Sequence, residues 1–303
     1  MTEQGSTPTI SVRGLTRRYR DQTALDDVSL DISGPSITGL LGRNGAGKST
    51  FLRIITGQEY ASAGQVHVLG GSPVENDAIL RRMVLVREDQ AYPDLRVGQV
   101  IRAASWFYPH WSGDLADSLL ADFDLPCGRP VKKLSRGMRS ALGIVIGLAA
   151  RAEVTLFDEP YAGLDAVARQ LFYDRLLASH TEDPSTVILS THLVDEVADL
   201  LEHVVMIDHG KIVLDAPADE VRGSVTAVSG SVTAVEEFVA GRTTWDRRRV
   251  GSHESLVVGG ALDRADRDRA RHLRLSLEAL SLQQVMVHAA GQPGDELTRK
   301  AHA

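Results

Sequence analysis

The stretch Gly42-Arg43-Asn44-Gly45-Ala46-Gly47-Lys48-Ser49 decides the fold of this chain. It fits the pattern G-x-x-x-x-G-K-[ST], and it lies between a short apolar run, 37–41, and apolar residues at helical spacing in 51–55. Glycines let backbone N–H groups close around a phosphate, and the N-terminus of the following helix favours negative charge. The stretch therefore predicts a phosphate-binding loop between a strand and a helix.

The residues of this loop have distinct roles toward a bound nucleoside triphosphate such as ATP. Lys48 is expected to reach the β- and γ-phosphates, and the Ser49 hydroxyl to ligate Mg²⁺. The alternative, a glycine-rich turn without a ligand, is disfavoured by the strand and helix patterns on either side. The residues predicted to contact the nucleotide here are Gly42, Arg43, Asn44, Gly45, Ala46, Gly47, Lys48, Ser49 and Thr50.

The composition is that of a folded, soluble and mildly acidic protein. The 303 residues carry 33 Lys+Arg against 40 Asp+Glu, a formal net charge of −7, which disfavours nucleic-acid binding along the whole chain. The single cysteine, Cys127, excludes an internal disulfide and a cysteine-based zinc site. Residues 1–10 do not resemble a secretory signal, and the longest apolar run, 141–150, is about half of the ~20 residues that a spanning helix needs. We therefore expect a cytoplasmic chain whose membrane role, if any, depends on a partner.

The order of the apolar patterns predicts an α/β fold. Short alternating runs at 10–12 and 28–32 indicate strands, and helical spacing from 97 to 125 indicates a small helical insertion, about 94–130. After 153 the patterns alternate between strand and helix, which is typical of a mostly parallel sheet. The expected elements are strands 154–157, 186–190 and 204–207 and helices 167–179 and 194–201.

The pattern changes near Pro217, which suggests a domain 1–215 followed by a small domain 216–303. The near-repeat 223–228 and 230–235 is too short for a repeat architecture. We interpret its first copy as a strand and its second as the start of a helix. Strands within 243–258, a charged helix at 262–273 and a final strand at 275–287 would complete a small α+β domain.

Two acids follow the apolar strand 154–157 directly. At the carboxyl edge of a parallel sheet, Asp158 would hold Mg²⁺ and Glu159 would polarise the attacking water. A pair of solvated acids at a strand end is the alternative interpretation. The position of the two acids, about 110 residues after a phosphate loop, favours the catalytic interpretation.

Several further motifs resemble those of the ATP-binding-cassette (ABC) ATPases. Leu134-Ser135-Arg136-Gly137-Met138 is similar to the LSGGQ signature, Gly163-Leu164-Asp165 to the D-loop, and Ser190-Thr191-His192 to the segment with the switch histidine. Tyr19 resembles the aromatic residue that stacks on adenine. The resemblance spans about 10–215 and implies a P-loop ABC ATPase domain, with a mostly parallel sheet, antiparallel N-terminal strands and a small helical subdomain.

The resemblance also implies a head-to-tail dimer around two ATP molecules. In such a dimer Ser135 and Gly137 of one copy contact the γ-phosphate bound by the other copy, and Asp165 lies beside the nucleotide. His192 links the γ-phosphate to the dimer interface. Ser135 and Gly137 would face five residues of the opposite copy, namely Lys48, Ser49, Asp158, Glu159 and His192.

Two positions depart from the family pattern. Met138 replaces the last glutamine of the signature, at a position that does not touch phosphate in the family. The glutamine expected after the strand 83–86, which contacts Mg²⁺, is replaced by Arg87 in an alignment without gaps, and Gln90 lies three residues further on. Gln90 is thus a candidate Mg²⁺ ligand only if this loop is rearranged.

Within the helical insertion, family members dock a short helix of the membrane subunit. Its aromatic residues are expected mainly in the core, with the docking surface as the alternative. They are Trp106, Phe107, Tyr108 and Trp111.

These features predict the ATPase subunit of an ABC exporter of the multidrug or lantibiotic-resistance type. It would act as a homodimer on the inner face of the membrane, beneath separately encoded permease subunits, with ATP and Mg²⁺ as cofactors and no nucleic-acid partner. An import ATPase shares every motif and stays open as an alternative. A soluble ABC ATPase acting on ribosomes or DNA is disfavoured by the single phosphate loop and the lack of long heptads. A non-hydrolysing scaffold is disfavoured by Glu159 and His192.

Overall fold

The computed structural model describes residues 8–285 of the chain. Its contacts divide the chain into two compact units, Met1–His192 with Val205–Ile212, and Leu193–Val204 with Val213–Ala303. The division into domains 1–215 and 216–303 stays a prediction, since the segment 193–204 joins the second unit.

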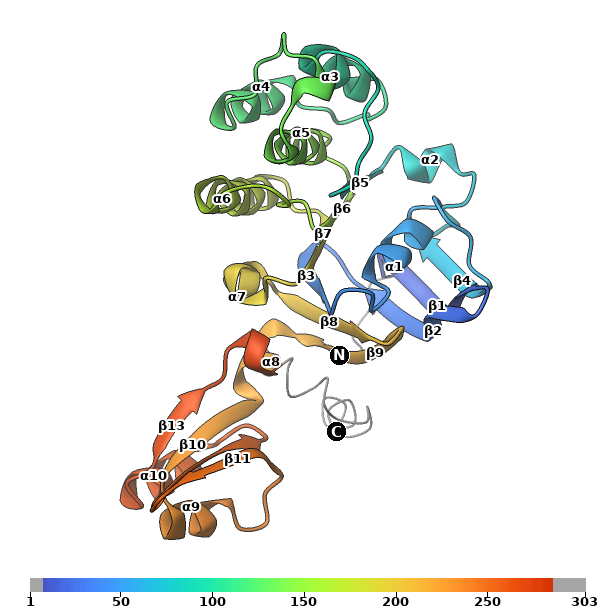
Figure 1. The fold of residues 1–303 in the computed structure, drawn as a ribbon. Helices are drawn as coiled ribbons and strands as arrows, with labels where there is room; N and C mark the ends of the chain where they lie inside the picture. Colours follow the sequence, from blue (N-terminus) through green and yellow to red (C-terminus); the bar gives the residue numbers. More distant parts are fainter. Residues whose placement is uncertain (1–7, 286–303) are drawn as a thin grey trace, which may run out of the picture. The chain divides into compact units, whose positions relative to one another are not determined.

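The first unit contains an antiparallel sheet of three strands in the order β2-β1-β4 (Figure 1). β1 pairs antiparallel with both neighbours, which places Ile10 opposite Ile32 on one side and Val68 on the other. All three side chains are buried, so the alternating pattern of these strands faces the core. The strands are β1 (Ile10–Tyr19), β2 (Gln22–Ile32) and β4 (Ala63–Val68).

A second sheet of six strands has the order β5-β6-β7-β3-β8-β9. Pairing is parallel between β5 and β6, β6 and β7, and β7 and β3, so these strands end at one edge. The predicted parallel sheet is confirmed. The strands are β3 (Ser36–Leu41), β5 (Met83–Arg87), β6 (Val154–Asp158), β7 (Thr186–Thr191), β8 (His203–Asp208) and β9 (Lys211–Pro217).

Helix α1 (Lys48–Ile55) links the two sheets of the first unit. Its side chains Phe51, Leu52 and Ile55 are fully buried in one cluster with residues of β1 and β6. Burial of such a side chain contributes about 1.5–3 kcal/mol, so α1 is fixed firmly at the end of the phosphate loop. The short helix α2 (Asp77–Leu80) precedes β5.

The predicted small helical subdomain is confirmed: it contains α3 (Val97–Ser105) and α4 (Gly113–Asp122), followed by the 3₁₀ turn η1 (Val131–Lys133) and α5 (Arg136–Ala149). Figure 1 shows α3, α4 and α5 grouped together. Helix α5 is buried from Ser140 to its end, because Gly147 brings it close to the sheet. A Cβ at Gly147 would lie 2.8 Å from Val86 and 2.9 Å from Phe157.

The insertion does not place all its aromatic residues in the core. Trp106 and Phe107 are 68% and 63% exposed at the end of α3, so the core interpretation is wrong for these two residues. Tyr108 and Trp111 are half-buried. The remaining helix of the first unit, α6 (Ala166–Glu182), begins at Asp165, whose carboxylate accepts a hydrogen bond from the Ala168 N–H at 2.8 Å.

The second unit begins with α7 (Val194–Val197), η2 (Ala198–Leu200) and α8 (Ala218–Gly223). A β-α-β-β-α-β run follows, with a four-stranded sheet in the order β11-β12-β10-β13. All pairings in this sheet are antiparallel. The elements are β10 (Val225–Ser231), α9 (Val232–Val239), β11 (Thr244–Val250), β12 (His253–Gly259), α10 (Arg264–His272) and β13 (Ser276–Ala279).

The predicted α+β tail is confirmed, including the change from strand to helix between the two near-repeats. Helices α9 and α10 share one core with β10 and β12, in which Val228 and Phe238 are buried. The final strand is shorter than predicted and ends at Ala279. The Ser281 hydroxyl accepts a hydrogen bond from the Gln284 N–H and starts a helical turn, which ends the strand. Val287, the predicted end, lies outside the described residues.

Candidate active site

A cavity of about 610 Å³ lies over the phosphate loop in the first unit. We call it the phosphate-loop cavity. It brings together residues from β1, β2, the loop, α1 and the carboxyl ends of β5, β6 and β7. Its lining residues are Tyr19, Gln22, Ala24, Arg43, Asn44, Gly45, Gly47, Lys48, Ser49, Thr50, Glu88, Arg136, Glu159 and His192.

Two glycines of the loop are required by close backbone contacts. Gly47 has φ +114°, and a Cβ there would lie 2.5 Å from the Ala24 carbonyl oxygen. Gly42 has φ +150°, and its Cβ would lie 2.2 Å from the Ile207 carbonyl oxygen. Gly42 and Ala46 do not line the cavity, so their contact with a nucleotide stays a prediction. The glycine pattern thus encodes a fixed, open cradle of backbone N–H groups.

Lys48 is held in the cavity by the loop itself. Its ammonium donates to the Gly42 carbonyl oxygen at 2.7 Å and lies 3.8 Å from Glu159 Oε1. The side chain is almost fully buried, and this burial lowers the pKa of Lys48, while the charges of Glu159 and Asp158 oppose the shift. A phosphate at this position would add negative charge that favours the protonated form of Lys48.

The residues beside Lys48 fit a magnesium ion. Asp158 is 6% exposed, and its Oδ1 has no hydrogen-bond partner among residues 8–285. Ser49 lines the cavity at the start of α1. The described residues hold no cluster of three or more His, Cys, Asp or Glu suited to a metal. Mg²⁺ is commonly held by one or two protein oxygens together with substrate phosphates, so Asp158 and Ser49 form a suitable set.

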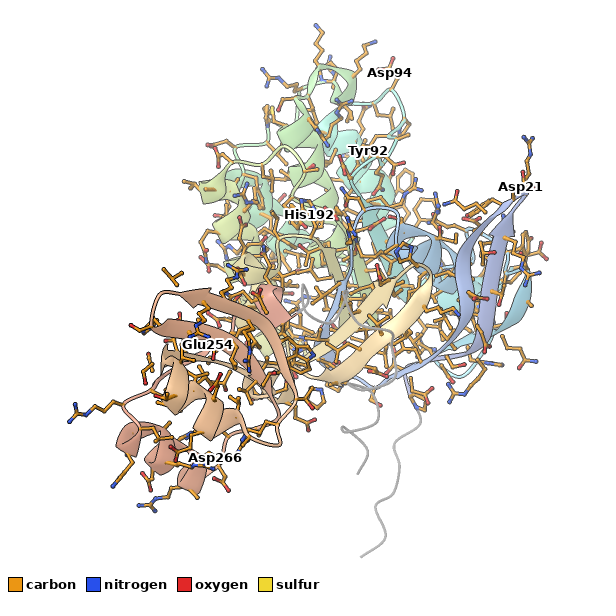
Figure 2. The ribbon with its side chains drawn as sticks, turned by 60° about the horizontal axis from the view of Figure 1, so that its bottom comes forward. Asp21, Tyr92, Asp94, His192, Glu254 and Asp266 are labelled. Atoms are coloured by element: carbon orange, nitrogen blue, oxygen red, sulfur yellow. The ribbon has the colours of Figure 1, made fainter. Side chains whose placement is uncertain are left out.

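Glu159 and His192 form a direct contact at the carboxyl ends of β6 and β7 (His192 is labelled in Figure 2). His192 Nδ1 lies 2.5 Å from Glu159 Oε2. The Tyr161 hydroxyl donates to the same oxygen at 3.4 Å and also contacts the Thr191 hydroxyl. Burial raises the pKa of Tyr161, so this side chain stays a neutral hydrogen-bond partner. The Glu159 carboxylate is therefore oriented from two sides, at the edge where β6 and β7 end.

Tyr19 lines the cavity at the end of β1. Its hydroxyl contacts the Glu59 carboxylate, and the Arg17 guanidinium lies 4.5 Å from the centre of its ring. Because Arg17 covers one face of the ring, a nucleotide base would stack on the opposite face.

The signature residues lie elsewhere. Ser135, Gly137 and Asp165 line a separate cavity of about 360 Å³, which we call the signature cavity. The Ser135 hydroxyl accepts a hydrogen bond from the Met138 N–H at 3.2 Å and caps α5. Gly137 is required here, because a Cβ would lie 2.4 Å from the Gly163 carbonyl oxygen. Within one chain, these residues do not share a cavity with Lys48.

The loop after β5 differs from the expectation for Arg87 and Gln90. Neither lines the phosphate-loop cavity; Gln90 Oε1 instead accepts from the Arg87 N–H at 3.4 Å. The lining residue is Glu88, whose N–H donates to the Asp158 carbonyl oxygen at 3.1 Å. The register could have identified it, since Arg87 pairs with Asp158 and the next residues must then be neighbours. Gln90 as a metal ligand stays a prediction without support from this geometry.

Comparisons with known proteins show the family of this chain. A family model described as "ABC transporter" matches residues 25–162, and one described as "AAA domain, putative AbiEii toxin, Type IV TA system" matches 128–198. The phosphonates import ATP-binding protein PhnC 1 of Natronomonas pharaonis is 34% identical over 72% of this chain and 98% of its own length. This chain belongs to the ATP-binding proteins of the ABC transporter family.

Other ABC relatives are named for export or drug resistance. The Nod factor export ATP-binding protein I of Ralstonia nicotianae is 33% identical, over 68% of this chain and 66% of its own length. The daunorubicin resistance ATP-binding protein DrrA3 of Streptomyces coeruleorubidus is 31% identical, over 70% and 69%.

Solved ABC structures share the fold. The ATP-binding subunit of an ABC transporter has a TM-score of 0.65 with 24% identity and covers 71% of this chain and 92% of its own. A dimeric cassette in a post-hydrolysis state, bound to ADP and phosphate, has a TM-score of 0.61 with 22% identity, over 69% and 98%. The predicted P-loop ABC ATPase fold is confirmed.

Proposed function

We propose that this ABC protein hydrolyses ATP at a site shared between two copies and drives export through separately encoded membrane subunits. One observation carries the proposal: a glutamate fixed by a histidine at 2.5 Å, in the same cavity as a buried phosphate-loop lysine. Phosphoryl transfer needs mainly positioning and charge stabilisation, and this cavity provides both.

Each side chain then has a defined task. Lys48 and the loop N–H groups bind the phosphates, and Tyr19 supports the base. Asp158 and Ser49 would hold Mg²⁺, which neutralises charge on the phosphate oxygens when it is bound. Glu159 orients the attacking water or accepts its proton, and His192 keeps the Glu159 carboxylate in place.

The separation of the two cavities supports a dimer. Ser135 and Gly137 lie in the signature cavity of the same chain, where they cannot complete the phosphate-loop cavity. In a head-to-tail dimer they would reach the γ-phosphate bound by the second copy. The solved dimeric cassette bound to ADP and phosphate has the same fold.

Exposed aromatic residues support a membrane partner, and the names of the relatives bear on the direction of transport. Trp106 and Phe107 are large, apolar and exposed on the helical insertion, which suits a docking surface for a helix of the permease. The described residues contain no helix that is both long and apolar enough to span a membrane. The relatives named for Nod factor export and daunorubicin resistance favour export, and the one named for phosphonates import favours the alternative. The chain would then lie on the inner face of the membrane.

A Glu159→Gln variant tests the hydrolytic site. It should bind ATP and form a stable dimer without turnover. Size-exclusion chromatography in the presence of ATP would show the dimer, and an assay of phosphate release would show the loss of turnover. Glu153→Gln is the matched control, since Glu153 lies at the opposite end of β6 and pairs with Arg82. Turnover close to wild type in Glu159→Gln would refute the role of Glu159.

A tagged chain purified from detergent-solubilised membranes tests the partner. We expect polytopic membrane proteins, and we expect Trp106→Ala with Phe107→Ala to lose them while ATP binding persists. An extracellular binding protein in the complex would indicate import. Recovery with ribosomal or DNA-associated proteins alone would refute transport and leave the ATPase assignment intact.

A further inference from the structure

The second unit contains a cavity of its own, of about 530 Å³. It lies among helix α10, strands β10 and β13 and the end of α8, and we call it the arginine-lined cavity. Its volume falls within the about 300–1,000 Å³ typical of small-molecule sites. The lining residues are Arg222, Gly223, Thr226, Ala261, Leu262, Arg267, Ala270, Arg271, Leu275, Leu277 and Ala279.

Small side chains leave this space unfilled. Thr226 of β10 pairs with Ala279 of β13, and Val228 pairs with Leu277, so these positions share the sheet face that the helices cover. Opposite them, α10 presents Ala270, which is 1% exposed. A layer of helix on sheet is normally filled by larger side chains, so alanine and threonine here produce a hollow. Leu262, Leu275 and Leu277 give it an apolar floor.

The charged side chains that line the cavity are all positive. Its charged lining residues are three arginines, although the whole chain has a net charge of −7. Of the acids at α10, Asp266 (labelled in Figure 2) pairs with Arg242 and the Asp263 carboxylate caps the helix, whereas Asp268 pairs with Arg271 of the lining. The cavity therefore combines an apolar interior with a cationic rim.

The three arginines differ in how far they are engaged. The Arg222 guanidinium contacts Asp219 and the Ala198 carbonyl oxygen, and Arg271 pairs with Asp268 at 3.2 Å. For Arg267, residues 8–285 provide no ion pair and no side-chain hydrogen bond. An exposed arginine at the mouth of an apolar cavity can bind a carboxylate or sulfonate with two donors.

We propose that the arginine-lined cavity binds an amphipathic organic anion. Arg267 and Arg271 bind the acidic head group, and the floor of Leu262, Leu275 and Leu277 packs against the apolar body. This site is distinct from the phosphate-loop cavity and does not depend on the proposed transport function.

Two fluorescent probes of similar shape test this site in the full-length protein. The first, 1-anilinonaphthalene-8-sulfonate, is anionic, and the second, N-phenyl-1-naphthylamine, lacks the sulfonate. We expect the double variant Arg267→Gln, Arg271→Gln to weaken binding of the anionic probe by about fivefold or more, with little change for the neutral one. Decanoate should displace the anionic probe, whereas ATP should not.

Two further variants distinguish binding in this cavity from nonspecific binding of the probes to the protein. Ala279→Leu, at an exposed lining position, should fill the hollow and weaken the binding of both probes. Arg264→Gln removes a charge from the same helix outside the lining and should leave both affinities unchanged. The circular dichroism spectrum and the thermal unfolding of each variant, compared with wild type, verify that the second unit is folded. An unchanged affinity for the anionic probe in the double variant, or an equal loss in Arg264→Gln, would overturn the proposal.

Discussion

The Arg136 guanidinium forms an ion pair with the Glu88 carboxylate, and both side chains line the phosphate-loop cavity. Arg136 is the first residue of α5, between Ser135 and Gly137, which line the signature cavity instead. The signature segment thus contributes to both cavities of the chain. Glu88 follows β5, at the sheet edge that also carries Asp158 and Glu159.

This ion pair leads to a prediction of opposite signs for its two members. Removing the Glu88 carboxylate from a cavity that binds a polyanion should strengthen the binding of metal-free ATP. Removing the Arg136 guanidinium should weaken this binding. We expect Glu88→Gln and Arg136→Gln to change the ATP affinity about three- to tenfold in these directions at low salt, because both side chains are partly exposed. Calorimetric titration with EDTA present measures this effect. Asp89→Asn, which alters the neighbouring pair with Arg87, is the control. Changes of the same sign in the two variants would contradict an electrostatic role.

The hydrogen bond between His192 and Glu159 predicts a loss of turnover rather than of binding. His192→Ala should reduce kcat about 100-fold with little effect on the KM for ATP, since the Glu159 carboxylate loses its closest partner. Tyr161→Phe removes only a longer contact with Glu159, together with the contact to the Thr191 hydroxyl, and should reduce kcat at most about fivefold. Steady-state phosphate release distinguishes the two. A larger effect of Tyr161→Phe would show that the tyrosine, not the histidine, positions the glutamate.

The close approach of Gly47 to Ala24 predicts that alanine cannot replace this glycine. Gly47→Ala would combine an unfavourable φ with a backbone clash, at a cost of about 1–3 kcal/mol in the free energy of unfolding, and should abolish ATP binding. Gly128→Ala is the matched control, because a Cβ there meets nothing within 4 Å. Thermal unfolding with and without ATP measures both effects. Wild-type ATP affinity in Gly47→Ala would contradict the structure of the loop.

The pair Arg82 and Glu153 predicts a pH-dependent contribution to stability. Two contacts of 2.6 Å from Arg82 hold the pKa of Glu153 below its ordinary value of 4.5. Because the folded-state pKa lies below the unfolded one, the contribution is present above pH 4.5 and is lost as the pH falls through the folded-state pKa. A double-mutant cycle with Arg82→Ala and Glu153→Ala should give a coupling energy of at most about 1 kcal/mol at neutral pH, since both side chains are exposed. A coupling energy that grows on acidification would refute this assignment.

The sequence predicted the elements whose patterns are local. The phosphate loop, the strand before Asp158 and the change from strand to helix near residue 231 all follow from spacing within a few residues. Glu88 was missed because its role depends on the register between β5 and β6, which are far apart in the chain. Trp106 and Phe107 were expected in the core because an aromatic side chain has the same apolar character in a core and at an interface.

The sequence by itself determined the chemistry of the first unit, because the phosphate loop, the paired acids and the histidine each act through a short segment with its own backbone geometry. Only the tertiary structure decided which of these segments share a cavity. It brought His192 into contact with Glu159 and placed Glu88 and Arg136 in the phosphate-loop cavity. Ser135 and Gly137 line the signature cavity instead. It also left a hollow under α10, because the fit of a helix on a sheet depends on side-chain volumes from separate strands and helices.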